Sequence, residues 1–236
     1  MTNDLGDSVV QAREVHKSYG SGELQVHVLR GVSLDVKRGE MVAIMGPSGG
    51  GKTTLLNCMS GLDDIDAGTI TIGGADLSEM SDTAKTRFRA TRMGYIFQSF
   101  NLLPVLTALE NVEMPLLVSG FPEKESREKA HEALSLVGLS HRAGHYPSEM
   151  SGGQQQRVTI ARALVNRPEI VWADEPTGNL DSENAGEVME LLIRLNKELD
   201  ETFVIVTHSD AVAEMSHRTV RMRDGLIVDD GTGKAV

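Results

Sequence analysis

The sequence predicts an α/β fold with a mainly parallel sheet, and three short apolar runs are the main reason. The runs lie within residues 40–46, 169–174 and 202–207, and each ends in glycine or a polar residue. Such runs are typical of strands that are buried on both faces of a parallel sheet. Between them, apolar residues recur at helical spacing over 130–137 and 188–199. Strands that alternate with helices indicate an α/β core.

Two stretches depart from this alternation. Residues 9–38 alternate between apolar and polar side chains and predict a small antiparallel sheet at the front of the chain. Residues 76–150 are mostly helical by pattern and are punctuated by glycine and proline. Because no repeat, low-complexity tract or long linker divides the sequence, we expect one domain over 1–236. Its parts would be a core at about 9–75 and 165–230, which includes the antiparallel strands, and a helical subdomain at about 76–164.

Composition excludes several classes of protein. The 236 residues include 23 Lys and Arg against 34 Asp and Glu, which gives a net charge of −11. This acidic balance argues against a nucleic-acid partner, because a phosphate backbone is bound by clustered basic side chains. Cys58 is alone and cannot form an internal disulfide. We expect neither a signal peptide nor a membrane span, so action at a membrane would need another chain.

A glycine-rich segment follows the first apolar run and predicts a phosphate-binding loop. Residues 46–53 fit the pattern G-x-x-x-x-G-K-[ST], with a strand expected before them and a helix after them. Glycines allow successive N–H groups to point inward at an anion, and the helix adds its positive end. Lys52 would reach the β- and γ-phosphates of a nucleotide, and the Thr53 hydroxyl would ligate Mg²⁺. The alternative is an ordinary glycine-rich turn. The residues expected to bind the nucleotide are Gly46, Pro47, Ser48, Gly49, Gly50, Gly51, Lys52, Thr53 and Thr54.

Two carboxylates follow the second apolar run. Asp174 is the expected second ligand of Mg²⁺, and Glu175 is the natural general base that would activate water. An Asp-Glu pair after a strand also commonly caps the next helix. The nearby phosphate loop favours the functional interpretation. By contrast, we expect Asp63, Asp64 and Asp66 to form a solvated loop, not a metal site.

Further motifs identify a family. Residues 151–157, Ser-Gly-Gly-Gln-Gln-Gln-Arg, resemble the signature motif of ATP-binding-cassette (ABC) ATPases. The other family motifs occur in the expected order, at residues 173–177, 178–181 and 207–208. Upstream, 95–98 resembles the glutamine loop of the family, and 18–20 resembles its adenine-stacking aromatic segment. The resemblance covers roughly residues 9–230. It implies a P-loop NTPase fold with a RecA-like core, ATP and Mg²⁺ as cofactors, and ATP hydrolysis.

The resemblance also assigns roles to individual residues. Tyr19 would stack on adenine, Gln98 would contact Mg²⁺ and the attacking water, and His208 would contact the γ-phosphate beside Glu175. If the resemblance is not used, Tyr19 is interpreted as a half-buried strand residue, His208 as a solvated residue and Gln98 as part of the core. The signature would serve the nucleotide of a second copy of the chain, so that two chains enclose two ATP molecules head to tail. Its residues are Ser151, Gly152, Gly153 and Gln154, and Asp181 would lie near the dimer interface.

Within the family, residues 98–104, 107–112 and 173–181 look like the macrolide-exporter, lipoprotein-release and cell-division branch. The resemblance therefore implies a bacterial or archaeal ATPase at the cytoplasmic face of the membrane, bound to a separate permease. Some relatives transmit force without carrying cargo. The rival class is a soluble mechanical ATPase of DNA repair, chromosome organisation or ribosome binding. The lack of a long heptad insert and of a second cassette argues against it, and Lys52, Glu175 and His208 together argue against an inactive regulatory cassette.

Overall fold

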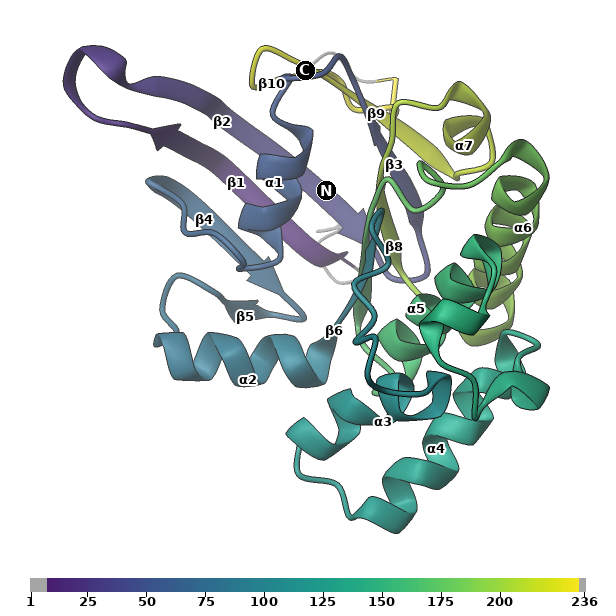
Figure 1. The fold of residues 1–236 in the computed structure, drawn as a ribbon. Coiled ribbons are helices and arrows are strands. Elements are labelled where there is room, and N and C mark those ends of the chain that lie inside the picture. The colour runs from purple at the N-terminus through teal and green to yellow at the C-terminus, as the bar shows by residue number, and fades with distance from the viewer. Residues whose placement is uncertain (1–7, 234–236) are drawn as a thin grey trace.

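The computed structural model describes residues 8–233, which form two sheets with α1 (Lys52–Met59) between them, in contact with strands of both (Figure 1). The larger sheet has six strands in the order β10-β9-β3-β8-β7-β6. All neighbouring pairs are parallel except β10 with β9. The mainly parallel sheet is thus confirmed. Its strands are β3 (Met41–Met45), β6 (Met93–Phe97), β7 (Ile170–Asp174), β8 (Phe203–Val206), β9 (Arg218–Arg223) and β10 (Leu226–Asp229).

Burial on both faces explains the continuous apolar runs. Successive side chains of a strand point to opposite faces of the sheet. In β8, Phe203 and Ile205 belong to the core shared with helices α3 to α6. The alternate residues, Val204 and Val206, belong to the core shared with α1 and the smaller sheet. Each face of this strand is therefore covered, and a polar residue at either position would lose its water contacts.

The smaller sheet is antiparallel, in the order β2-β1-β4-β5. Strands β1 (Ser8–Tyr19) and β2 (Val26–Lys37) are joined through a short 3₁₀ turn, η2 (Gly22–Leu24). They confirm the antiparallel strands that the sequence predicts over 9–38. Strands β4 (Ala67–Ile72) and β5 (Ala75–Asp76) extend this sheet and are not evident from the sequence pattern.

The remaining helices lie mainly over the other face of the six-stranded sheet and beyond its edge (Figure 1). The stretch 76–164 contains four helices, but it is not helical throughout, because β6 lies within it and forms the edge of the large sheet. A Cβ at Gly94 of β6 would lie 2.4 Å from the carbonyl oxygen of Ala163, so α5 packs directly on this strand. The division into core and helical subdomain stays a prediction. The helices are α2 (Asp82–Arg92), α3 (Ala108–Val118), α4 (Glu123–Leu136), α5 (Gly152–Leu164), α6 (Ser182–Leu199) and α7 (Asp210–Glu214), with 3₁₀ turns η3 (Ser140–Arg142) and η4 (Pro147–Glu149).

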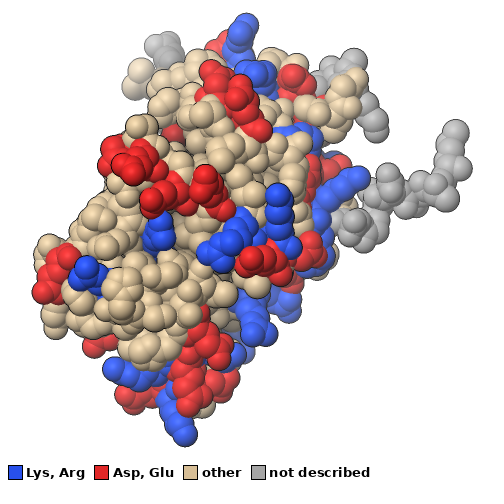
Figure 2. Space-filling view, turned by 90° about the vertical axis from the view of Figure 1, so that its right-hand side faces the viewer, with Lys and Arg blue, Asp and Glu red and all other residues tan. Residues whose placement is uncertain are grey.

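Among residues 8–233, no helix has the length and apolar character that crossing a membrane requires. The start of the chain, on which the expectation about a signal peptide rests, lies outside the described residues. Lys and Arg side chains are interspersed with Asp and Glu on the face shown in Figure 2.

Candidate active site

The predicted phosphate loop joins β3 to α1. A Cβ at Gly46 would lie 2.1 Å from the carbonyl oxygen of Met222, so only glycine fits there. Gly49 and Gly51 have φ angles of 78° and 93°, in the left-handed region that glycine adopts without strain. No side chain caps α1 at Gly51, and its first turn carries no acidic residue. The loop and helix therefore present N–H groups and a positive helix end to an anion.

Lys52 and Thr53 begin α1 and face different partners. The Lys52 ammonium donates to the carbonyl oxygens of Gly46 and Pro47, at 2.9 and 3.0 Å, and so lies across the loop. The Thr53 hydroxyl donates to Asp174 Oδ1 at 3.3 Å. The nucleotide loop and the end of β7 thus meet, as the sequence predicts.

Thr53 and Asp174 are suited to Mg²⁺. A hydroxyl and a carboxylate are hard oxygen ligands, and Mg²⁺ usually takes only one or two carboxylates besides substrate phosphates. Accordingly, the described residues contain no group of three or more His, Cys, Asp or Glu side chains that could hold a metal by themselves. Burial raises the pKa of Asp174, with the charge of Glu175 adding to it, while Thr53 and Lys52 act in the opposite direction. A cation at this position would favour the charged carboxylate.

Glu175 and His208 are in contact. His208 Nδ1 lies 2.8 Å from Glu175 Oε1. The carboxylate side chain is 18% exposed, whereas the imidazole is 72% exposed and reaches toward solvent. Both residues follow central strands, since the Glu175 N–H donates to Val206 O of β8 and Thr207 N–H donates to Ile44 O of β3. The structure thus brings together the predicted base and the predicted histidine.

Gln98 follows β6 at the same edge of the sheet, because Phe97 pairs with Asp174 of β7. Its side-chain amide donates to Asn179 Oδ1 at 3.2 Å, and Asn179 Nδ2 donates to the Gln98 carbonyl at 3.0 Å. Among the hydrogen bonds of the described residues, none joins Gln98 to Thr53, Asp174 or Glu175. Its expected contact with Mg²⁺ therefore stays a prediction, and Asn179 is a partner that sequence reasoning missed.

Tyr19 ends β1 with its ring 42% exposed. Its hydroxyl donates to Asp63 Oδ2, and the nearly buried Lys17 donates to Asp63 Oδ1 at 2.7 Å. This bond to Asp63, with burial, raises the pKa of Tyr19, while a hydrogen bond with Thr54 of α1 opposes the rise. The half-exposed ring beside the first turn of α1 is available for stacking. The expectation that Asp63 is simply solvated is wrong, because the side chain holds Tyr19 and Lys17.

The signature residues form a second group. Ser151 caps α5 by accepting from the Gln154 N–H at 3.2 Å, and Gln154 Oε1 accepts from the Ser151 N–H. A Cβ at Gly153 would lie 2.2 Å from Asn184 Oδ1, and Asn184 in turn donates to Asp181 at the start of α6. No hydrogen bond of the described residues joins residues 151–154 to the phosphate loop at 46–53. The predicted nucleotide contacts of one chain therefore fall into two groups, one at α1 and one at α5.

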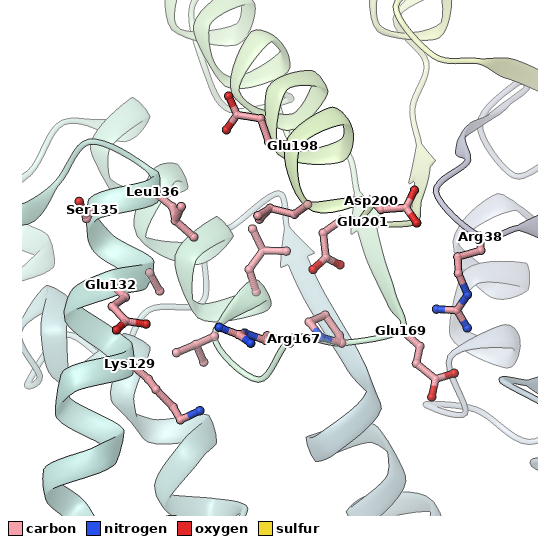
Figure 3. Close-up of a pocket in the computed structure, with 15 residues that line it drawn as sticks. Arg38, Lys129, Glu132, Ser135, Leu136, Arg167, Glu169, Glu198, Asp200 and Glu201 are labelled. Carbon is pink, nitrogen blue, oxygen red and sulfur yellow. The ribbon is translucent and has the colours of Figure 1, made fainter.

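A separate hollow of about 810 Å³ lies at the opposite, amino-terminal end of the strands (Figure 3). Glu169 and Glu201 line it; Glu169 directly precedes β7, and Glu201 lies two residues before the start of β8. Burial and the neighbouring charge of Asp200 raise the pKa of Glu201 to about 7. Since none of the predicted nucleotide residues lines this hollow, it is not the candidate active site.

Known proteins resemble the chain in sequence and in fold. A family profile described as ABC transporter matches residues 29–178. The chain belongs to the ABC transporter family. As a member of this family it is an ATP-binding subunit and an ATPase, which confirms the expected activity. It is 46% identical to the lipoprotein-releasing system ATP-binding protein LolD of Bacteroides thetaiotaomicron, over 94% of this chain and 100% of that protein. It is 50% identical to the ABC transporter ATP-binding protein YtrE of Bacillus subtilis, over 87% of this chain and 89% of that protein.

A solved structure of the family confirms the fold. MJ0796, described as a bacterial ABC transporter cassette in dimeric form, superposes with a TM-score of 0.84 at 43% identity, over 92% of this chain and 96% of that one. A second structure of MJ0796 is a dimeric post-hydrolysis state bound to ADP and inorganic phosphate. These alignments extend beyond the 150-residue profile match, so the ABC cassette fold reaches over almost the whole chain.

Proposed function

We propose that this ABC ATPase works as a head-to-tail dimer that encloses two ATP molecules and drives a separate membrane permease of the lipoprotein-release type. The observation that carries the proposal is that α1, which follows the phosphate loop, and α5, which begins at the signature, pack into the two different cores on opposite faces of the large sheet. A second copy related by a twofold axis would bring the signature of one chain to the loop of the other. The dimeric state of MJ0796 supports this arrangement.

The chemistry would be transfer of the γ-phosphoryl group to water. Glu175 would accept a proton from the attacking water, and His208, 2.8 Å from its carboxylate, would hold that carboxylate and contact the γ-phosphate. Lys52, the loop N–H groups and the signature helix of the second chain would stabilise negative charge on the transferred group. Thr53 and Asp174, together with Gln98, would be the residues that hold Mg²⁺, which would supply positive charge to offset the charge of the phosphates.

Similarity to LolD proteins supports the proposal of a membrane partner. LolD proteins are named as ATP-binding parts of a lipoprotein-releasing system, and one of them aligns over its whole length with 94% of this chain. We infer that this chain acts at the cytoplasmic face of the membrane as a peripheral subunit. Transmission of force without cargo is the second candidate, since the cargo-contacting surface would belong to the permease.

Co-purification from solubilised membranes tests the permease. We expect the tagged chain to retain one integral membrane protein in detergent, and its ATPase activity to change when that protein is present. The matched control is the same preparation from a strain in which the gene for the co-purified membrane protein has been deleted. Recovery with ribosomes or DNA, and without any integral membrane protein, would overturn the proposal in favour of a soluble mechanical ATPase.

A further inference from the structure

A buried amide on α5 connects three segments of the active site. Gln156 is fully buried, and its Nε2 donates to the carbonyl oxygen of Pro176 at 2.5 Å. The same nitrogen makes a longer contact of 3.5 Å with the carbonyl oxygen of Phe97. The hydroxyl of Thr159, one turn along α5, lies 2.8 Å from the Gln156 carbonyl oxygen and 3.0 Å from Gln156 Oε1, so its one proton is shared between them and the amide oxygen is the end that faces this donor. One side chain therefore links α5 to the loop after β7 and to the end of β6.

Each of these segments carries a proposed functional residue next to the point of contact. Glu175 directly precedes Pro176, and Gln98 directly follows Phe97. The signature residue Gly153 lies three positions before Gln156 on the same helix. The amide thus sits where the general base, the glutamine loop and the signature helix meet.

The backbone at Glu175 needs external support. Its φ angle is 47°, a left-handed value that costs a residue other than glycine of the order of 1–2 kcal/mol. A residue before proline also prefers an extended conformation, so the position is unfavourable on two counts. Such a conformation persists only where the surroundings hold it. Two backbone hydrogen bonds support the conformation of Glu175, from Glu175 N–H to Val206 O and from Gly178 N–H to Glu175 O. Gln156 adds a hydrogen bond to the carbonyl oxygen of the next residue, Pro176.

We propose that Gln156 is a positioning residue for ATP hydrolysis, which holds Glu175 in its strained conformation and ties it to the signature helix. The link would make the placement of the base depend on the position of α5, and hence on whether the signature at its start has engaged the ATP of the second chain. The proposal rests on Glu175 acting as the general base. It predicts an effect on turnover and little effect on ATP binding, because Gln156 contacts neither the phosphate loop nor Tyr19 in the described structure.

The test is Gln156→Met, which keeps the length of the side chain and removes the donor. We expect kcat of the full chain to fall by roughly 10- to 100-fold, as for a catalytic group displaced by about 1 Å, with KM for ATP within about threefold of wild type. The matched control is Asn196→Leu, because Asn196 is also a buried amide that bridges two carbonyl oxygens, those of Gly39 and Glu201, far from this site. We expect the control to lower Tm similarly and to leave kcat within about twofold. Equal loss of kcat in both variants, or wild-type kcat in Gln156→Met, would overturn the proposal.

A double-mutant cycle separates this proposal from the proposed function. In a Glu175→Gln background we expect Gln156→Met to lower the residual turnover by less than about threefold, since its effect passes through Glu175. A full multiplicative loss would show that Gln156 acts elsewhere and would overturn the positioning role. If Glu175→Gln alone kept wild-type turnover, the assignment of the base would be wrong instead.

A second variant is used if Gln156→Met fails to fold. Thr159→Val removes the hydroxyl that orients the amide and is expected to lower kcat by about two- to fivefold with unchanged KM. Unchanged kcat in Thr159→Val would count against the proposal.

Discussion

At the scale of single residues, the sequence indicates which side chains carry the proposed chemistry. It does not indicate which residues those side chains contact. Glu175 and His208 each follow an apolar strand, and the pairing of β7 with β8 brings their side chains to 2.8 Å. The left-handed backbone at Glu175 and its link to Gln156 could not be predicted, because the signature motif includes Gln156 but does not indicate that its amide reaches the carbonyl oxygen of Pro176. The contact of Asp63 with Tyr19 is likewise not predictable from the sequence, since only the fold brings the two side chains together.

Tyr19 provides the first prediction at this scale. Stacking of a base on an aromatic ring contributes about 1–3 kcal/mol, so Tyr19→Ala is expected to raise KM for ATP by roughly tenfold or more with a small change in kcat. Tyr19→Phe keeps the ring, loses the bond to Asp63 and should raise KM by only about two- to threefold. GTP should be affected similarly, because stacking tolerates different bases. Steady-state kinetics with both nucleotides checks this, and equal KM values for the Ala variant and the wild type would rule out stacking.

At the scale of elements, strands buried on both faces are predictable and edge strands are not. The sequence identifies β3, β7 and β8 because each face of such a strand packs on a core. Strand β10, at the other edge, and its neighbour β9 mix charged and apolar residues and give no comparable run. The sequence pattern places the segment of β6 within a predicted helical stretch. Its place in the sheet depends on pairing with β7.

Two glycines test how elements pack. Gly94→Ala would place a methyl group 2.4 Å from Ala163 O, so α5 must shift from β6, and we expect a loss of about 1–3 kcal/mol of stability. Gly186→Ala lies within α6 with open space around it and should stabilise the protein by about 0.5–1 kcal/mol. Chemical denaturation of both variants gives the comparison. The packing described here would be contradicted if the two changes had effects of the same sign.

The hollow at the amino ends of the strands provides a pH-dependent prediction. Burial raises the pKa of Glu201 from 4.5 to about 7, so the folded chain keeps a proton that the unfolded chain loses. Between about pH 4.5 and 7 the free energy of unfolding therefore falls as pH rises, and above pH 7 the full cost is present. Glu201→Gln should remove this cost and raise stability at pH 8 by on the order of 2 kcal/mol. Thermal unfolding at pH 8 and pH 5 checks this; an advantage for the Gln variant that did not shrink at pH 5 would exclude Glu201 as the cause.

At the scale of the whole molecule, the net charge does not predict the charge of the ligand that a local site binds. The net charge of −11 argues against nucleic acid, yet the chain binds a polyphosphate as a member of the ABC family. The contacts proposed for it, one lysine and the N–H groups of a glycine loop, are placed together at a helix start. Because the predicted nucleotide contacts of one chain form two separate groups, the central question is whether two chains form a dimer around ATP.

The most direct test of the account is the oligomeric state and turnover of Glu175→Gln with ATP and Mg²⁺. Without the base, we expect hydrolysis to fall by on the order of 10²- to 10⁴-fold, while ATP still closes the dimer because its binding groups are intact. Light scattering after size-exclusion chromatography should then show a dimer with ATP and a monomer without nucleotide, and Glu214→Gln, an exposed glutamate on α7, should keep wild-type turnover. A Glu175→Gln protein that stays monomeric with saturating ATP, or that hydrolyses ATP at the wild-type rate, would contradict the account.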